Sequence, residues 1–211
     1  MIASEPAIIR EQLRRGAFYA ERAYPADAEP AGAVAIVPPH PHMGGTMNNN
    51  LVAALAAALA TTRITLRFDY SAVVGTPASL AAFWATGHAP EDPSLIDDAS
   101  AAIGQLRDLA GVEPAVVGYS FGAFAAWRLD LDGPLALVSP TLTRHEFAGR
   151  RSPLLVVYSD DDFATPREVS EQFCKVHGCE AQLVSGGQHF YRGHEATVAD
   201  RLERFLAGGE A

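Results

Sequence analysis

The residues whose types and spacing indicate chemistry begin with a serine between two glycines, in the pattern Gly118-x-Ser120-x-Gly122. Residues 115–117 before it are apolar and partly β-branched, as in a short buried strand, and residues 122–128 after it favour a helix. At a tight strand-to-helix turn, glycines let two backbone segments pass closely while the serine is held in a strained conformation that exposes its hydroxyl. The pattern predicts a nucleophilic serine; the alternative interpretation is a serine that only caps the helix.

A serine hydroxyl becomes a good nucleophile only when a base removes its proton, so we expect a histidine downstream of the serine to be that base. There are four candidates: His145 in a polar loop, His177 near a helix end, His189, and His194 at the start of the last helix. His189 follows a predicted strand and two glycines, where its side chain can reach over the edge of a sheet. We therefore expect His189 to be the base, with His194 as the alternative.

A third group must fix the tautomer of the histidine, and three aspartates follow one predicted strand. Successive side chains at a strand end point in different directions, so only one or two of Asp160, Asp161 and Asp162 can face a site. Asp162 lies in the loop just before a helix predicted to start at Pro166. We expect Asp162 to be the acid and keep Asp160 as the alternative; the competing interpretation is a cap or turn carboxylate.

The anionic tetrahedral intermediate of acyl transfer needs two hydrogen-bond donors. The amide N–H of Phe121, directly after the serine, is the first that we expect. The second is expected from the rigid proline- and glycine-rich loop 38–46, where prolines cannot donate and the candidates are His40, His42 and Met43. We favour the backbone N–H of His40. The two histidines could instead bind a metal, but no carboxylate or cysteine stands near them in the sequence, so we expect no metal site.

These candidates follow predicted strands in a chain where strands and helices alternate. The expected strands are 33–37, 64–70, 115–117, 135–138, 154–158 and 181–184, and the expected helices are 51–60, 97–109, 122–128, 166–176 and 195–206. Such alternation predicts an α/β fold with a mostly parallel sheet and helices on both faces. Ligands bind at the carboxyl ends of the strands in such sheets, which is where the candidate residues lie.

The first 32 residues form an entry segment whose structure the sequence leaves open. Residues 8–15 fit either a short helix or a charged strand, residues 17–24 fit a strand, and residues 26–32 fit a loop. Residues 71–77 are expected to be irregular.

Composition and length favour one globular domain covering residues 1–211, because 48% of the 211 residues are hydrophobic. The formal net charge of −9 disfavours nucleic acid and anionic membranes as partners. The N-terminus lacks the pattern of a signal peptide and no apolar window is long enough to span a bilayer, so we expect a cytoplasmic protein. The two cysteines, Cys174 and Cys179, are expected to be reduced thiols.

Several motifs, spread over most of the chain from residue 33 to 206, resemble one family. They are PPHPHMGGTM at 38–47 with Asn49, RFDY at 67–70, GYSFG at 118–122, Asp162-x-x-x-Pro166 and GQHF at 187–190. Together they resemble the α/β-hydrolases, and within them the small serine hydrolases with little lid that are related to dienelactone hydrolases. The resemblance implies an open cleft, little or no cap domain, and hydrolysis of an ester or related acyl bond without a cofactor.

The chain departs from this family at two places. Relatives usually carry a glycine-rich turn of the Arg-Gly-x-Gly-x-Ser kind after the second motif strand, whereas residues 71–76 are Ser-Ala-Val-Val-Gly-Thr. Asp161 stands where a smaller residue is commoner. The first departure bears on the shape of the substrate pocket and the second on which aspartate is the acid.

The function predicted from these residues is a serine hydrolase that forms an acyl-enzyme on Ser120 with a small-molecule acyl substrate. The alternatives are acyl transfer, cyclisation or elimination by the same residues, and a non-catalytic binding protein with the same fold. Aromatic residues that could line an acyl pocket are Phe83, Trp84, Phe124, Phe147, Phe163 and Phe190, and the residues expected to contact substrate are His42, Met43, Tyr119, Phe163 and Phe190.

Overall fold

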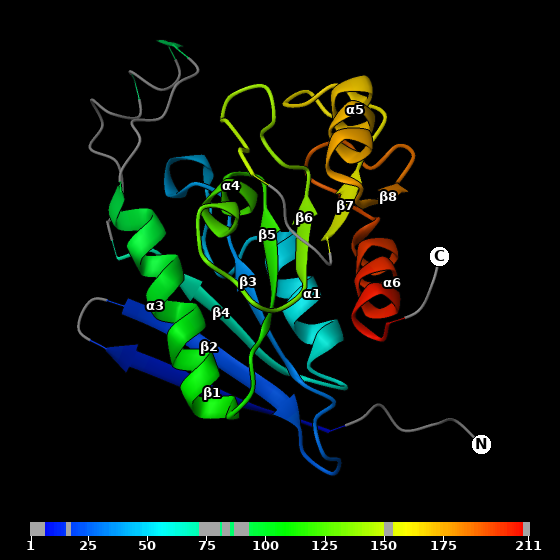
Figure 1. The fold of residues 1–211 in the computed structure, drawn as a ribbon. Coiled ribbons are helices and arrows are strands. Elements are labelled where there is room, and N and C mark those ends of the chain that lie inside the picture. The colour runs from blue at the N-terminus through cyan, green and yellow to red at the C-terminus, as the bar shows by residue number, and fades with distance from the viewer. Residues whose placement is uncertain are drawn as a thin grey trace.

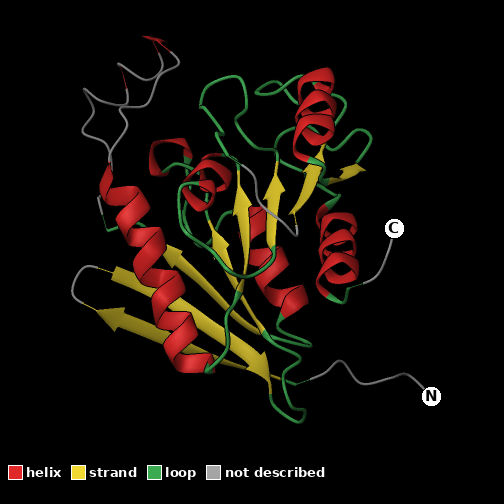
Figure 2. Ribbon diagram, viewed as in Figure 1, coloured by secondary structure: helices red, strands yellow, loops and turns green. Residues whose placement is uncertain are grey.

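A computed structural model describes residues 7–15, 18–71, 81, 85–86, 93–149 and 154–208 of the chain, in which strands and helices alternate (Figure 1 and Figure 2). The strands of these residues are β1 (Ile8–Arg15), β2 (Phe18–Pro25), β3 (Ala33–Val37), β4 (Ile64–Asp69), β5 (Ala115–Tyr119), β6 (Leu135–Val138), β7 (Leu154–Tyr158) and β8 (Glu180–Leu183). The helices are α1 (Asn50–Leu59), α3 (Pro93–Ala110), α4 (Phe121–Trp127), α5 (Arg167–His177) and α6 (Glu195–Leu206), with a 3₁₀ turn, η1 (Pro41–Met43).

In the described residues, the strands form one sheet in the order β1-β2-β4-β3-β5-β6-β7-β8. β2 pairs antiparallel with both β1 and β4, and all the neighbouring pairs from β4 to β8 are parallel. The carboxyl ends of the parallel strands therefore lie along one edge of the sheet, at the top of Figure 1. This topology confirms the predicted α/β fold with a mostly parallel sheet.

Helices cover both faces of the sheet, as predicted (Figure 2). Every position of β3 and β5 is buried, which explains why these strands are apolar without alternation. One apolar core joins the sheet to α3, α4 and α5, and a second joins its other face to α1 and α6. These two cores hold the central strands, and hence their carboxyl ends, in place.

The sequence allows either a helix or a strand at residues 8–15. In the structure these residues form β1, which pairs antiparallel with β2. Glu21 of β2 accepts hydrogen bonds from Arg10 and Gln12 of β1, at 3.1 and 2.9 Å, and from Nε of Arg67 of β4, at 3.0 Å. Polar side chains at alternate positions of β1 thus find partners across the strands. Those partners lie outside the sequence of β1, so its local sequence alone does not decide between a helix and a strand.

Two of the helix starts that differ from the prediction involve a proline. α3 begins at Pro93 rather than at residue 97, since proline fits the first turn of a helix. α5 begins at Arg167, and Pro166 precedes it with an extended ψ of 145° instead of being its first residue. Residues 72–77 of the expected irregular stretch, together with Phe83 and Trp84, lie outside the described residues.

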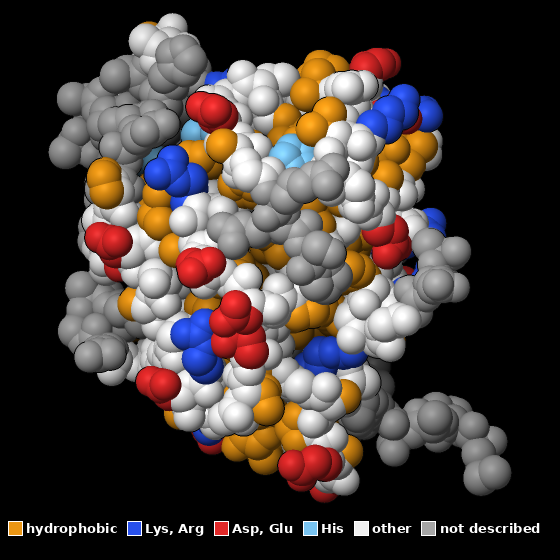
Figure 3. Space-filling model, viewed as in Figure 1, with side chains coloured by type: hydrophobic (Ala, Val, Ile, Leu, Met, Phe, Trp, Pro, Cys, Tyr) orange, Lys and Arg blue, Asp and Glu red, His pale blue; other side chains and the backbone are white. Residues whose placement is uncertain are grey.

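Cys174 of α5 and Cys179 after it are both free thiols. None of the helices in the described part of the chain is long and apolar enough to cross a membrane. On the face of the molecule drawn in Figure 3, acidic and basic side chains are interspersed among hydrophobic ones.

Candidate active site

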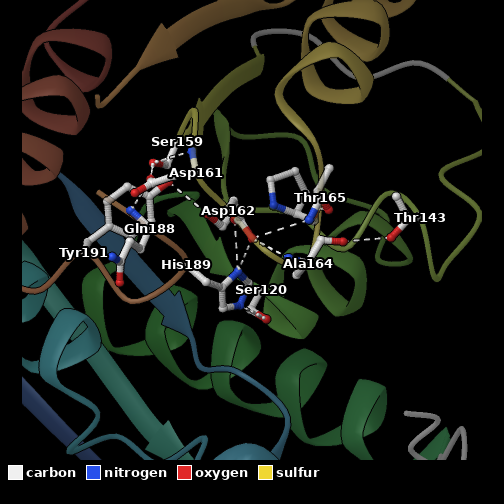
Figure 4. A network of polar contacts seen from close by, with 12 residues as sticks. Ser120, Thr143, Ser159, Asp161, Asp162, Ala164, Thr165, Gln188, His189 and Tyr191 are labelled. Atoms are coloured by element: carbon white, nitrogen blue, oxygen red, sulfur yellow. Dashed lines mark hydrogen bonds and ion pairs between the residues drawn. The ribbon is translucent and has the colours of Figure 1, made fainter. Parts of the chain in front are cut away.

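Ser120 lies in the turn between β5 and α4, at the carboxyl end of a central strand (Figure 4). Its φ of 57° and ψ of −117° belong to a region that residues with a side chain rarely adopt. Among the described residues, its side chain makes no capping hydrogen bond to α4, so helix capping does not explain the serine. Tyr119 and Phe121 on either side are buried, whereas Ser120 is partly exposed. The strained turn thus presents the hydroxyl at the edge of the sheet.

The two glycines of the motif allow three backbone segments to meet at this turn. A Cβ atom on Gly118 would lie 2.4 Å from the carbonyl oxygen of Gly122. A Cβ atom on Gly122 would lie 2.2 Å from the carbonyl oxygen of Val37 and 2.5 Å from that of Pro38. Since backbone atoms cannot easily move aside, any side chain here would push α4 away from β5 or from the loop after β3.

The strain at Ser120 can be measured by comparing two small replacements. We expect Ser120→Gly to be more stable than Ser120→Ala by about 1 kcal/mol, because glycine adopts positive φ without a steric cost. Both variants lose the hydroxyl, so the comparison isolates the backbone. In the helical control, Ala123→Gly should instead destabilise by about 1 kcal/mol. Denaturant unfolding measures these differences in the free energy of unfolding. Equal stability of Ser120→Gly and Ser120→Ala would contradict a strained turn.

His189 connects Ser120 to Asp162 through its two ring nitrogens (Figure 4). Its Nε2 lies 3.0 Å from Oγ of Ser120, and its Nδ1 lies 2.9 Å from Oδ1 and 3.0 Å from Oδ2 of Asp162. His189 and Asp162 are both buried. The alternative base, His194, stands at the start of α6, and His145 has its Nδ1 2.8 Å from the hydroxyl oxygen of Thr141. The structure therefore brings together the three residues that the sequence favoured.

The surroundings of Asp162 stabilise its ionised form. Burial opposes ionisation, but hydrogen bonds from His189 and Ser139, the charge of His189 and the amide of Ala164 outweigh it, so the pKa of Asp162 lies below its usual range. The amides of Ala164 and Thr165 lie 2.7 and 3.4 Å from its Oδ1. A carboxylate held in this way can fix the tautomer in which Nδ1 of His189 carries the proton and Nε2 faces the serine.

The other two aspartates hold the loop that carries His189. Asp160 accepts hydrogen bonds from the hydroxyl of Ser185 and from the amide of Gly186, the latter at 2.8 Å, and these bonds lower its pKa. Asp161 accepts a hydrogen bond from the amide of Gln188 at 2.8 Å. Asp160, the alternative acid, thus accepts hydrogen bonds from the turn at residues 185–186 and not from the imidazole of His189. The carboxylates of Asp160, Asp161 and Asp162 therefore each form hydrogen bonds with a different part of the loop that carries His189.

The loop after β3 packs against the first turn of α4. The ring centroids of His40 and Phe121 lie 4.9 Å apart, edge to face. Within the loop, the amide of His42 donates to Nδ1 of His40 at 3.2 Å, and the amide of Met43 donates to the carbonyl of His40 at 2.8 Å. Two of the three candidate donors, the amides of His42 and Met43, are therefore used inside the loop. In the described residues, no three His, Cys, Asp or Glu side chains group as a metal site would require.

The position of Tyr119 corrects the expectation that it contacts substrate. Its side chain is buried in the core shared with α1 and α6, and its hydroxyl donates to the carbonyl of His189 at 2.7 Å. Side chains alternate between the two faces of a strand, and Tyr119 points from β5 into the core beneath His189. Phe124 and Phe147, which were considered for an acyl pocket, are buried in the other core. Phe163 and Phe190 remain exposed beside His189.

Sequence reasoning missed the hydroxyls behind Asp162. The hydroxyl oxygens of Ser139, directly after β6, and Tyr191, after His189, lie 2.8 Å apart, and the hydroxyl of Ser139 contributes to the lowered pKa of Asp162. Tyr191 is fully buried, and burial raises its pKa, so it stays a neutral donor. Ser139 could have been suspected because it directly follows a predicted strand. Nothing in the local sequence marks Tyr191.

Comparison with solved structures reveals several similar proteins. An α/β serine hydrolase homologue from Coxiella burnetii shares 25% sequence identity with a TM-score of 0.74, covering 94% of this chain and 97% of that chain. A member of the α/β serine hydrolases without a lid, from Xanthomonas campestris, shares 19% identity with a TM-score of 0.73, and the match covers 97% of this chain and 94% of that chain. A dienelactone hydrolase from Anabaena variabilis shares 14% identity with a TM-score of 0.66, covering 98% and 100%. No family model and no curated protein matches the sequence.

Proposed function

We propose that this chain, whose fold is that of the α/β serine hydrolases, is a serine hydrolase that cleaves a carboxylic ester or a related acyl bond. The observation that carries the proposal is the hydrogen-bonded series from Ser120 through His189 to Asp162, with 3.0 and 2.9 Å between successive polar atoms. A serine next to an imidazole that a carboxylate orients is the arrangement that nucleophilic acyl transfer requires.

In the proposed acylation step, Nε2 of His189 takes the proton from the hydroxyl of Ser120 as its oxygen attacks the carbonyl carbon. The ionised Asp162 stabilises the imidazolium that forms. The amides of Phe121 and His40 donate to the oxyanion, since the contact of their rings keeps the loop and the helix start together. His189 then returns the proton to the leaving oxygen, the carbon–oxygen bond breaks, and the acyl group stays on Ser120.

In the proposed deacylation step, a water molecule takes the place of the departed group. His189 accepts one of its protons while the water oxygen attacks the ester carbonyl of the acyl-enzyme. The second tetrahedral intermediate uses the same two amide donors. Its collapse returns the proton to Oγ of Ser120 and releases the acid. These steps need the residues of this chain, a small acyl substrate and water, without a cofactor.

The proposal is tested by the hydrolysis of p-nitrophenyl acetate, butyrate and octanoate, followed by the release of p-nitrophenolate. We expect steady turnover of at least one of these esters, and the dependence on chain length measures the space for the acyl group. Adding glycerol and analysing the products distinguishes water from an alcohol as the acyl acceptor. Acid as the main product supports hydrolysis, whereas a glycerol ester as the main product overturns it. No turnover of any of the three esters would also count against the proposal.

The hydrogen bond from the amide of Gln188 to Asp161, in the loop that carries His189, leads to a further prediction. Asp161→Ala should lower kcat by about 10- to 100-fold with little change in KM, because Gln188 loses its anchor and the imidazole shifts. Asp161→Asn keeps an acceptor for the amide of Gln188 and should retain most of the activity. Steady-state kinetics at saturating ester checks this, with Asp27→Ala in the exposed loop after β2 as the control. Full activity of Asp161→Ala would show that the loop is held without Asp161.

A further inference from the structure

Two phenylalanines beside His189 lie on the surface although they are large and apolar. Phe163 is 64% exposed and Phe190 is 38% exposed. Their ring centroids lie 5.8 Å apart, and they lie 4.9 and 5.6 Å from the imidazole of His189. Exposed apolar side chains that gather in one place usually mark a binding surface. These two rings gather at the residue that we propose as the catalytic base.

The backbone that carries this pair is held by hydrogen bonds on both loops. Next to Phe163, the carbonyl of Ala164 accepts a hydrogen bond from the hydroxyl of Thr143 at 2.8 Å. The carbonyl of Phe190 accepts a hydrogen bond from the side-chain amide of Asn50 at 3.0 Å. The two rings therefore project from anchored backbone and form a preorganised apolar surface. A surface of this kind binds an apolar group without first having to order its own backbone.

The contacts of His189 indicate which part of a substrate this pair would meet. Its imidazole has the buried ring of Tyr119 at 5.8 Å on the core side and the exposed ring of Phe163 at 4.9 Å. In acyl transfer, the imidazole returns its proton to the leaving oxygen, so the leaving group must lie against the imidazole. The oxyanion lies instead at the amide of Phe121. Rings that contact the imidazole at the surface thus border the leaving group and not the acyl chain.

We infer that Phe163 and Phe190 form the leaving-group subsite, and that the substrate is an ester of an alcohol with an aromatic or bulky apolar portion. This inference rests on the proposed function and names its substrate class. It changes the assignment made from the sequence, which placed both phenylalanines in the acyl pocket. When the carbon–oxygen bond breaks, the alkoxide takes the proton from Nε2 of His189 and departs as the neutral alcohol. The acyl group remains on Ser120, so atoms and charges balance.

The test compares esters that differ on one side only, using the full-length protein. Benzyl acetate and ethyl acetate share the acyl group, and ethyl phenylacetate places the ring on the acyl side instead. We expect the ratio of kcat/KM for benzyl acetate to that for ethyl acetate to fall about 10-fold in Phe163→Ala and in Phe190→Ala. Phe163→Leu should recover part of the ratio. Tyr19→Ala, which removes another exposed aromatic ring, from β2, serves as the control and should leave the ratio unchanged.

The outcomes separate this inference from the proposed function. A fall in the benzyl-to-ethyl ratio with no change in the ratio of ethyl phenylacetate to ethyl acetate supports the subsite. An unchanged benzyl-to-ethyl ratio overturns it, as does a fall confined to ethyl phenylacetate, which would place the pair on the acyl side. In both of these cases the wild type still hydrolyses esters through Ser120. Failure of the wild type to hydrolyse any of the esters, including p-nitrophenyl acetate, would instead contradict the proposed function.

Discussion

Replacing Ser120 by alanine should lower kcat for a p-nitrophenyl ester by about 10⁴- to 10⁶-fold, while the protein stays folded. Alanine lacks the oxygen that would carry the acyl group, and no other hydroxyl is placed 3.0 Å from Nε2 of His189 among the described contacts. The remaining rate should come from binding and from the oxyanion donors alone. The measurement is kcat at saturating substrate, with unfolding curves to confirm that the variant is folded.

The control for this prediction is Ser100→Ala on the exposed side of α3, where alanine favours the helix. That variant should retain wild-type kcat. A Ser120→Ala protein that keeps more than about a tenth of the wild-type kcat would show that Ser120 is not the nucleophile, since removal of a nucleophile costs several orders of magnitude.

Replacing Asp162 by asparagine should lower kcat by about 10⁴-fold without unfolding the protein. The amide of asparagine is nearly the same size, and its oxygen can still accept from the amide of Ala164, now at 2.7 Å from Oδ1. Its NH₂ group, however, would donate to Nδ1 of His189. The imidazole would then carry its proton on Nε2, where it cannot take the proton of Ser120.

Asp160→Asn provides the matched control, because Asp160 stands two positions earlier and bonds the turn at residues 185–186. We expect this variant to lose less than about 10-fold in kcat, since asparagine keeps an acceptor for Gly186. If Asp160→Asn lost as much activity as Asp162→Asn, or if Asp162→Asn were fully active, the assignment of the acid would be wrong. Kinetics of the two variants side by side decide the question.

Much of the site could be predicted because each of its residues follows a strand. The motif around Ser120 has a local explanation. A Cβ atom at Gly118 or Gly122 would lie only 2.4 or 2.2 Å from a backbone carbonyl oxygen, so both positions require glycine. The same alternation of strands and helices predicted the sheet. His189 could be favoured over the other histidines because a strand and a turn precede it.

Other features depend on partners that are distant in the sequence. The preference for Asp162 over Asp160 rests on which carboxylate bonds His189, 27 residues away, at 2.9 Å. β1 is a strand because β2 pairs with it and lies next to β4. Tyr119 belongs to the core because β5 is covered on both faces, a fact that its position beside Ser120 does not reveal.

The most direct test of the central claim is the mass of the intact protein after reaction with a fluorophosphonate, followed by peptide mapping. Such a reagent phosphonylates a serine only when a base activates it, with loss of fluoride. The account predicts one adduct per chain, located on Ser120, and none in Ser120→Ala or His189→Ala. An unmodified wild-type protein, or an adduct that persists in Ser120→Ala, would contradict the claim that Ser120 is the activated nucleophile.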